Sequence, residues 1–387
     1  MKNKSIIILI LLLSFFSCRN SSQDQSVQTV NITFSNIKES VNLSDIGSSL
    51  LVPLETNDLA LIGNIAKIIT VKDYIYISDN SSLFRFSLDG KFLGKISKQG
   101  NGPGEYISIS DFQINQDGNA WIISKTNKHL NLYSWNNETL EQIPLDRWVS
   151  NILLKDENEM IIYTGNEKDK TNRYQMSYMD LKTKKITNSF LPIDEQKATF
   201  LFVKSPTLFF KTKSNNLLFY ESFNDTIYDV QTSGVKSKYV INWDKHNIPQ
   251  TFFAKDFSNI MDFFTELQKN NFAYGCSFFM ETKKNYLISF FYQKKNNWVI
   301  KSKDSGDCTV FNQLKIDDNL CNFPIDLTDN LCFAQENGNI IFPLSVDAIR
   351  NFSDSITDSA MKEKLKKIIP CESENQNPVI LIIKNLE

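Results

Sequence analysis

The stretch that decides the fold is KDYIYISDNSSLFRFSLDGKFLGKI, residues 72–96. It holds three short runs of apolar residues that are separated by polar turns. Asp89-Gly90 lies in the second turn, where a tight antiparallel hairpin needs positive φ. Short bursts of β-branched and aromatic residues, divided by turns every 8–12 residues, are typical of meandering antiparallel strands. The stretch therefore predicts strands rather than helices.

Runs of the same kind recur along the chain, and each follows a polar turn. The starts of the six runs are Tyr74, Ala120, Met160, Leu217, Tyr286 and Ile340. Their mean spacing is about 53 residues, which leaves room for about four strands a unit. A four-stranded sheet cannot bury both of its faces alone, whereas sheets stacked radially can. We therefore predict an all-β fold, a six-bladed β-propeller with four-stranded antiparallel blades.

Two segments depart from strand periodicity, and the ends of the chain are expected to meet. Residues 251–271 and 358–369 carry apolar residues at helical spacing, so we predict one or two short inserted helices. We expect the first to pack on the propeller itself rather than on a partner. Either 49–54 or 30–34 is expected to pair with 379–383 and close the ring.

The N-terminus reads as a targeting signal. Lys2 and Lys4 precede the apolar run 6–16, which is too short to span a hydrocarbon core of about 30 Å as a helix. We predict a signal peptide over residues 1–17, a polar tether over 18–29 and a single propeller domain over 30–387.

The end of this signal resembles the lipobox of bacterial lipoproteins, in the loose form common in Bacteroidetes. Ser17, a small residue, directly precedes Cys18. The resemblance implies that Cys18 carries the lipid and holds the exported protein at a membrane. An ordinary secretory peptide is the alternative. Surface-export signals of such lipoproteins are acidic after the Cys, whereas this tether has only Asp24, so we expect the periplasmic face of the outer membrane.

Three further motifs look like landmarks of the six-bladed β-propeller lipoproteins of Bacteroidetes, distant relatives of NHL-type propellers. They are Lys98–Tyr106 (KQGNGPGEY), 223–228 (FNDTIY) and 377–384 (NPVILIIK). The resemblance covers the chain from about residue 30 to its end and implies an exported binding protein without an established activity. A phosphate-binding loop at 100–105 is disfavoured, because Pro103 removes an amide donor and no GK[ST] follows. An inter-blade turn is preferred.

Composition excludes several classes of function. The chain has 42 Lys and Arg against 44 Asp and Glu, scattered along its length, so we expect no nucleic-acid partner. His129 and His246 are the only histidines and cannot alone form a His-rich metal centre. No GxSxG, HExxH or EF-hand pattern occurs, so an enzyme is the less favoured class.

We expect a lipid-anchored binding module for a peptide, a glycan or an envelope protein, without a cofactor. The alternative is a tunnel-centred hydrolase, similar to lactonases, in which Asp79 and Glu221 hold Ca²⁺. Both acids follow candidate strands and could face the channel, although exposed loop carboxylates are the commoner case. A scaffold docked through the helix near 252–267 is a third alternative.

Besides Cys18, five cysteines follow the predicted signal peptide. Cys321 and Cys332 are separated by ten residues and form the most plausible local disulfide in an exported protein. Buried free cysteines that act as small hydrophobic residues are an equally acceptable interpretation.

Overall fold

The structure is a computed structural model. It describes the ranges 27–167, 172–198, 207–212, 216–317, 322–328, 332–335, 337–369 and 376–384, without the side chains of 276 and 277. The predicted signal peptide, Cys18 and Cys321 lie outside the described residues. Those predictions therefore stay predictions.

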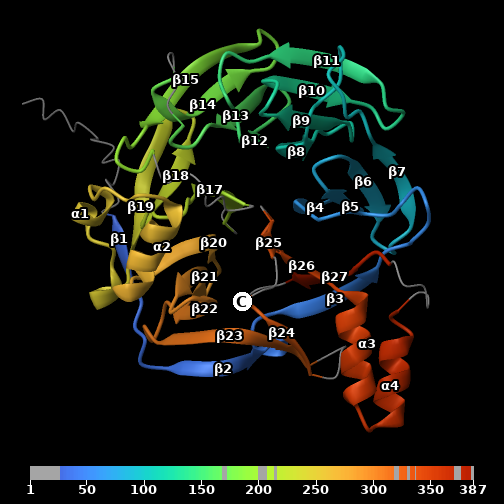
Figure 1. Ribbon diagram of the computed structural model, residues 1–387, viewed down its shortest axis with the longest axis vertical. Helices are drawn as coiled ribbons and strands as arrows, with labels where there is room; N and C mark the ends of the chain where they lie inside the picture. The colour runs from blue at the N-terminus through green and yellow to red at the C-terminus, as the bar shows by residue number, and fades with distance from the viewer. Residues whose placement is uncertain are drawn as a thin grey trace, which may run out of the picture.

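The fold is an all-β propeller. Figure 1 shows the sheets set side by side in a ring around a central space. Within the described residues the strands form six sheets, and most neighbouring strands are antiparallel. Sheets arranged in this way cover each other's faces, which is the burial that the repeat predicts.

Five sheets are built around four consecutive strands each. The first sheet contains β4 (Lys67–Val71), β5 (Tyr74–Ser78), β6 (Leu83–Ser87) and β7 (Phe92–Ile96). The second contains β8 (Asp111–Ile114), β9 (Ala120–Ser124), β10 (His129–Tyr133) and β11 (Thr139–Pro144). The third contains β12 (Asn151–Leu154), β13 (Glu159–Tyr163), β14 (Tyr174–Asp180) and β15 (Lys185–Pro192). The fourth contains β16 (Phe209–Lys211), β17 (Leu217–Phe219), β18 (Thr226–Gln231) and β19 (Gly234–Asn242). The fifth contains β20 (Tyr274–Glu281), β21 (Asn285–Tyr292), β22 (Lys295–Ser302) and β23 (Cys308–Ile316), and β24 (Phe323–Asp326) pairs with β23.

The sixth sheet joins the two ends of the described chain. It contains β25 (Phe333–Ala334), β26 (Ile340–Leu344), β27 (Val379–Lys384) and β3 (Ser48–Pro53), and β3 pairs antiparallel with β27. The predicted closure through 49–54 is thus confirmed, and closure through 30–34 is wrong. The chain supplies five blades of four consecutive strands, not the six that the sequence predicts, because the remaining sheet is completed by an N-terminal strand.

The segment before β3 runs along the outer edges of two blades. β1 (Gln28–Asn31) pairs in parallel with β19, and β2 (Ile37–Asn42) pairs in parallel with β23 before the short helix η1 (Leu43–Asp45). These strands give otherwise open edges a partner. The N-terminal segment therefore ties three successive sheets together.

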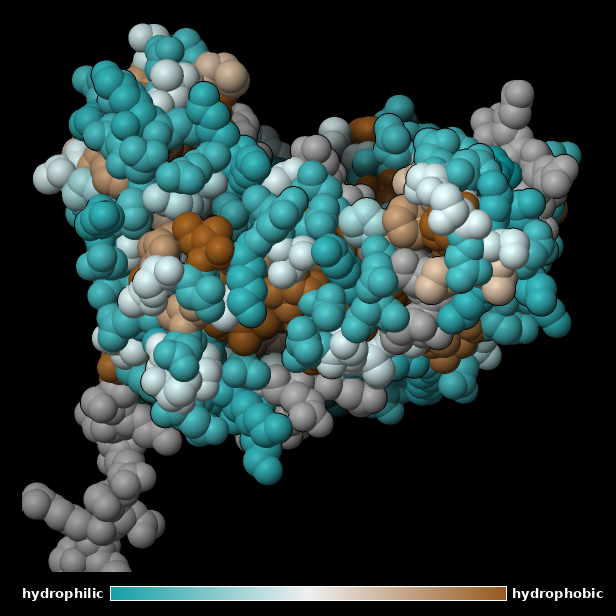
Figure 2. Space-filling model, turned by 90° about the horizontal axis from the view of Figure 1, so that it is seen from below, coloured by the Kyte–Doolittle hydropathy of each residue, from teal (hydrophilic) through white to brown (hydrophobic). Residues whose placement is uncertain are grey.

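All six predicted run starts fall in the second strand of a sheet. These strands are β5, β9, β13, β17, β21 and β26, and most of their residues are buried. A strand with neighbours on both sides and a blade on each face carries apolar residues in an unbroken run. Figure 2 shows that the outer surface seen from below is largely hydrophilic, with apolar side chains between polar ones.

The predicted helix at 251–271 is two helices. After η2 (Asp244–His246) come α1 (Gln250–Phe253) and α2 (Ile260–Lys269), and the Asn259 side chain caps α2 by accepting from the backbone N–H of Met261 and of Asp262. This cap restarts the chain as a new helix. Phe252 and Phe263 are buried in the same cluster as Phe223, so packing on the propeller is confirmed.

A second helical pair follows β26. α3 (Val346–Ser355) was not expected from the sequence, whereas α4 (Ser359–Lys366) falls within the predicted range 358–369. Ser345 caps α3 by accepting a hydrogen bond from the backbone N–H of Ala348. Figure 1 shows the two helices side by side at the rim of the ring.

Candidate functional site: the central cavity

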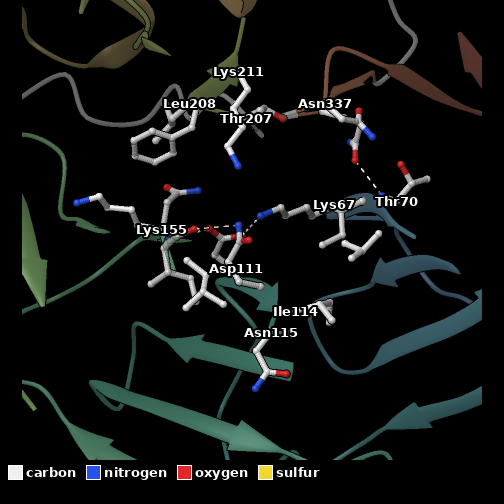
Figure 3. A pocket seen from close by; sticks show the side chains of 18 of the residues that line it. Lys67, Thr70, Asp111, Ile114, Asn115, Lys155, Thr207, Leu208, Lys211 and Asn337 are labelled. Atoms are coloured by element: carbon white, nitrogen blue, oxygen red, sulfur yellow. Dashed lines mark hydrogen bonds and ion pairs between the residues drawn. The ribbon is translucent and has the colours of Figure 1, made fainter. Parts of the chain in front are cut away.

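A cavity of about 420 Å³ lies at the centre of the ring, lined by residues in and next to β4, β8, β12, β16 and β25. These are the inner strands of five different sheets. Figure 3 shows that their side chains converge on this space. A concave site with a few placed polar groups is the usual form of a small-ligand pocket.

A buried ion pair holds one wall of the cavity. Lys67 Nζ lies 2.5 Å from Asp111 Oδ1, and the two side chains point toward each other in Figure 3. Asp111 also accepts hydrogen bonds from the backbone N–H of Phe112 at 2.8 Å and of Ile152 at 2.9 Å. Three donors compensate the cost of burying this carboxylate. Asp111 therefore links the inner strands of the first three blades.

Two glutamines continue these links around the cavity. Gln335 Oε1 accepts from the backbone N–H of Thr70, and its Nε2 donates to the carbonyl of Ile68, both at 2.9 Å. Gln113 Nε2 donates to the carbonyl of Ile152 at 3.2 Å. Since each bond runs from a side chain to the backbone of a neighbouring sheet, the wall is fixed in position before any ligand arrives.

The lining combines apolar and polar surface. Ile69, Leu208 and Phe209 supply apolar contacts, while Thr70 and Asn151 supply hydrogen-bonding groups. Thr70 Oγ1 is buried and has no partner within the described part of the chain. Such a lining suits a ligand that is partly apolar and partly hydrogen-bonding.

Asp79 does not line this cavity. It lies in the turn after β5, where Oδ1 accepts from the backbone N–H of Ser81 at 3.0 Å and of Ser82 at 2.7 Å. Its Oδ2 accepts from the backbone N–H of Gly63 at 3.1 Å. These bonds are those of a turn-forming aspartate.

Glu221 does not line the cavity either. It is buried between the third and fourth blades, where Tyr163 donates its hydroxyl proton to Oε2 at 2.5 Å and Asn224 Nδ2 donates to Oε1 at 3.2 Å. Burial raises the pKa of the Glu221 carboxyl above its ordinary value and also raises the pKa of Tyr163. Among the described residues no three His, Cys, Asp or Glu side chains gather as metal ligands.

A second, partly buried carboxyl follows Glu221 four residues later in the sequence. Asp225 Oδ1 accepts a hydrogen bond from Trp243 Nε1 at 2.8 Å, and burial raises the pKa of Asp225 to about 6. Lys197, which donates to the carbonyl of Phe223 at 2.8 Å, lowers that pKa in part by its charge. Sequence reasoning missed this group of residues, because Lys197, Asp225 and Trp243 come from separate segments of the chain.

The glycine-rich loop is an inter-blade turn, as expected. It connects β7 to β8, and Tyr106 donates its hydroxyl proton to the carbonyl of Ser81 at 2.9 Å. Gly104 has φ +72°, and a Cβ there would lie 2.6 Å from Thr139 Oγ1. Glycine is therefore required at this position for both backbone conformation and space.

The family model for a domain of unknown function, DUF4934, matches residues 27–384. The chain belongs to the DUF4934 family. No curated protein matches it.

Solved structures resemble this DUF4934 chain in fold. A crystallised protein of Bacteroides fragilis, described as exported, is 20% identical, with a TM-score of 0.71 over 92% of this chain and 100% of that one. A DUF4221 family member from Bacteroides vulgatus is 10% identical, with a TM-score of 0.51 over 88% and 97% of the two chains. At these identities the likeness concerns the fold alone.

Two further features of the DUF4934 chain concern its helices and its cysteines. In the described part of the chain, no helix is both long enough and apolar enough to cross a membrane. Cys332 is buried, but its predicted partner Cys321 lies outside the described residues, so the disulfide stays a prediction. Cys308 is buried, and its Sγ accepts from the backbone N–H of Thr33.

Proposed function

We propose that this protein is an exported, lipid-anchored binding module of the cell envelope, and that the central cavity is its binding site. Its partner is a peptide, a glycan or an envelope protein that presents a partly apolar, partly polar group to the cavity. The observation that carries the proposal is the cavity of about 420 Å³ with its cross-linked wall.

The wall supports binding because its polar groups are held by the propeller. Lys67, Asp111, Gln113 and Gln335 are fixed by bonds between sheets, so little conformational entropy is lost when a ligand binds. The half-buried Asn151 lines the cavity and is left to meet the ligand.

Export and anchoring rest on two observations. The similar protein of Bacteroides fragilis is described as exported. Residues 1–18 have the pattern of a lipoprotein signal that ends at Cys18. We place the protein at the periplasmic face of the outer membrane.

No observation favours the hydrolase alternative. Asp79 is engaged in a turn and Glu221 in a buried pair with Tyr163, and neither is part of the cavity lining. The scaffold alternative is not favoured either, since Phe252 and Phe263 are buried.

A cavity-filling variant tests the proposal. Asn151→Trp places a large ring in the cavity, and we expect about a tenfold or greater loss of partner captured from envelope extract. The matched control is Leu140→Trp on β11, which is 49% exposed on the outer edge and should capture as the wild type does. Equal capture by both variants, with unchanged thermal unfolding, would overturn the proposal.

A further inference from the structure

Arg85 on β6 lies against two aromatic rings where the first and second blades meet. Figure 1 shows the sheet of β4–β7 beside the sheet of β8–β11. The guanidinium carbon Cζ lies 4.5 Å from the centre of the Trp135 ring and 5.6 Å from the centre of the Tyr74 ring. Trp135 belongs to the turn between β10 and β11, so the two rings come from neighbouring blades. Attraction of the cation to these rings fixes the position of the guanidinium.

The rings beside Arg85 are themselves held in place. Trp135 Nε1 donates to the carbonyl of Gly118 at 2.7 Å. The buried Tyr76 ring lies 5.6 Å from the Trp135 ring and 6.2 Å from the Tyr74 ring, measured between centroids. The guanidinium is therefore positioned before any ligand arrives, which lowers the entropy cost of binding.

The guanidinium of Arg85 has no hydrogen-bond acceptor. Within the described residues it makes no hydrogen bond and no ion pair, and of its three nitrogens only Nε is fully buried. The other arginines of the described chain, Arg147, Arg173 and Arg350, each donate to an oxygen atom. A guanidinium carries five N–H donors, and rings against its faces satisfy none of them. The donors on Nη1 and Nη2 are thus unpaired and within reach of a ligand.

Space is open beside Arg85. Its partner on β7 is Gly94, and a Cβ built on Gly94 would meet no atom within 4 Å. Directly paired residues of antiparallel strands point to the same face of a sheet, so this open space lies on the face that carries Arg85. Tyr74 is 36% exposed, so the site reaches the surface of the protein.

We propose that Arg85 binds an oxyanion group of a ligand, a carboxylate or a phosphate. Either group accepts two parallel N–H bonds from one guanidinium, and its negative charge compensates the charge of Arg85. The exposed part of the Tyr74 ring contacts the adjoining apolar part of the ligand. Neither Arg85 nor Tyr74 lines the central cavity, so this site goes beyond the proposed function and does not depend on it.

The test measures the binding of benzoate, benzamide and inorganic phosphate to the purified protein by isothermal titration calorimetry at constant ionic strength. We expect benzoate to bind the wild type at least about tenfold more tightly than benzamide, which has the same ring without the charge. Tighter binding of phosphate than of benzoate would assign the site to phosphate groups, and the reverse order would assign it to carboxylates.

Variants of Arg85 locate this binding. Arg85→Met keeps an unbranched chain beside the rings and removes the charge, so the affinity for benzoate should fall at least about tenfold with unchanged thermal unfolding. Arg85→Lys keeps the charge without the two parallel donors, so we expect a smaller loss. The matched control is Arg350→Met on α3, which removes the same charge from a residue paired with Asp347 and should bind benzoate as the wild type does.

Four results would overturn the proposal. They are the absence of binding by both benzoate and phosphate, equal affinity of the wild type for benzoate and benzamide, equal affinity of Arg85→Met and Arg350→Met for benzoate, and wild-type affinity in Arg85→Lys. The last result decides the matter if Arg85→Met fails to fold. Benzoate held in the central cavity instead would be lost in Asn151→Trp and kept in Arg85→Met, so the two sites can fail separately.

Discussion

The carboxyls of Asp111 and Asp225 are both withdrawn from solvent, and they differ in how the cost of desolvation is compensated. Asp111 meets a lysine and two backbone amides. The Asp225 carboxyl accepts a hydrogen bond from the Trp243 indole, and burial raises its pKa to about 6. The first arrangement stabilises a charge at the cavity wall, and the second favours the protonated acid.

Asp225 predicts a specific pH dependence of stability. Between the ordinary pKa of 3.8 and about 6 the folded state binds more protons than the unfolded state, so the free energy of unfolding falls as pH rises through this window. The loss is about 3 kcal/mol by pH 7. Asp225→Asn keeps an acceptor for Trp243 and should be more stable than the wild type at pH 7, with a shallower slope from pH 4 to 6, measured by urea unfolding.

Some slope should remain in Asp225→Asn, since the pKa of Glu221 is also raised by burial. Asp117→Asn, in the exposed turn before β9, is the control and should keep the profile of the wild type. An unchanged profile in Asp225→Asn would contradict the assignment of the slope to this carboxyl.

Among the elements, β27 and the loop after β3 form the joint that closes the ring. β27 begins next to Asn377, whose side chain makes three hydrogen bonds to the backbone of residues 55–62. β3 then pairs with β27 along its whole length. Closure therefore depends on a strand ladder and on one buried amide.

Asn377→Ala tests this joint. The change leaves the N–H of Ile62 and the carbonyls of Glu55 and Ala60 without their partner, so we expect a loss of about 2–4 kcal/mol in the free energy of unfolding. Asn57→Ala in the same loop removes an exposed cap and should cost less than about 1 kcal/mol. Similar losses in both variants, measured by denaturant unfolding, would contradict this role of Asn377.

The second strand of each sheet could be predicted from the sequence, whereas the inner strands and one helix could not. The runs from Tyr74 and Ala120 were found because a strand covered on both sides is apolar throughout. Inner strands such as β8 and β16 were not predicted, because strands of three or four residues are too short to show a hydrophobic periodicity. Helix α3 was not predicted because it has few apolar positions, although Ser345 is a recognisable N-cap residue.

At the scale of the whole molecule, ring closure was more accessible to sequence-based prediction than the central cavity. The pairing of 49–54 with 379–383 was one of the two closures that the sequence predicted, because both segments are apolar runs at opposite ends of a repeat. The cavity could not, because its wall is assembled from five sheets by side chains such as Asp111 and Gln335 that look ordinary in sequence. Asp79 and Glu221 were selected from strand ends alone, and neither position is part of the cavity lining.

The central claim is that the cavity of this propeller holds a ligand. Native mass spectrometry of the full-length protein, purified from its own envelope, tests it most directly. We predict a bound mass on the wild type and on Leu140→Trp that is absent from Asn151→Trp, which fills the cavity. Identical spectra for the wild type and for a folded Asn151→Trp would contradict the claim.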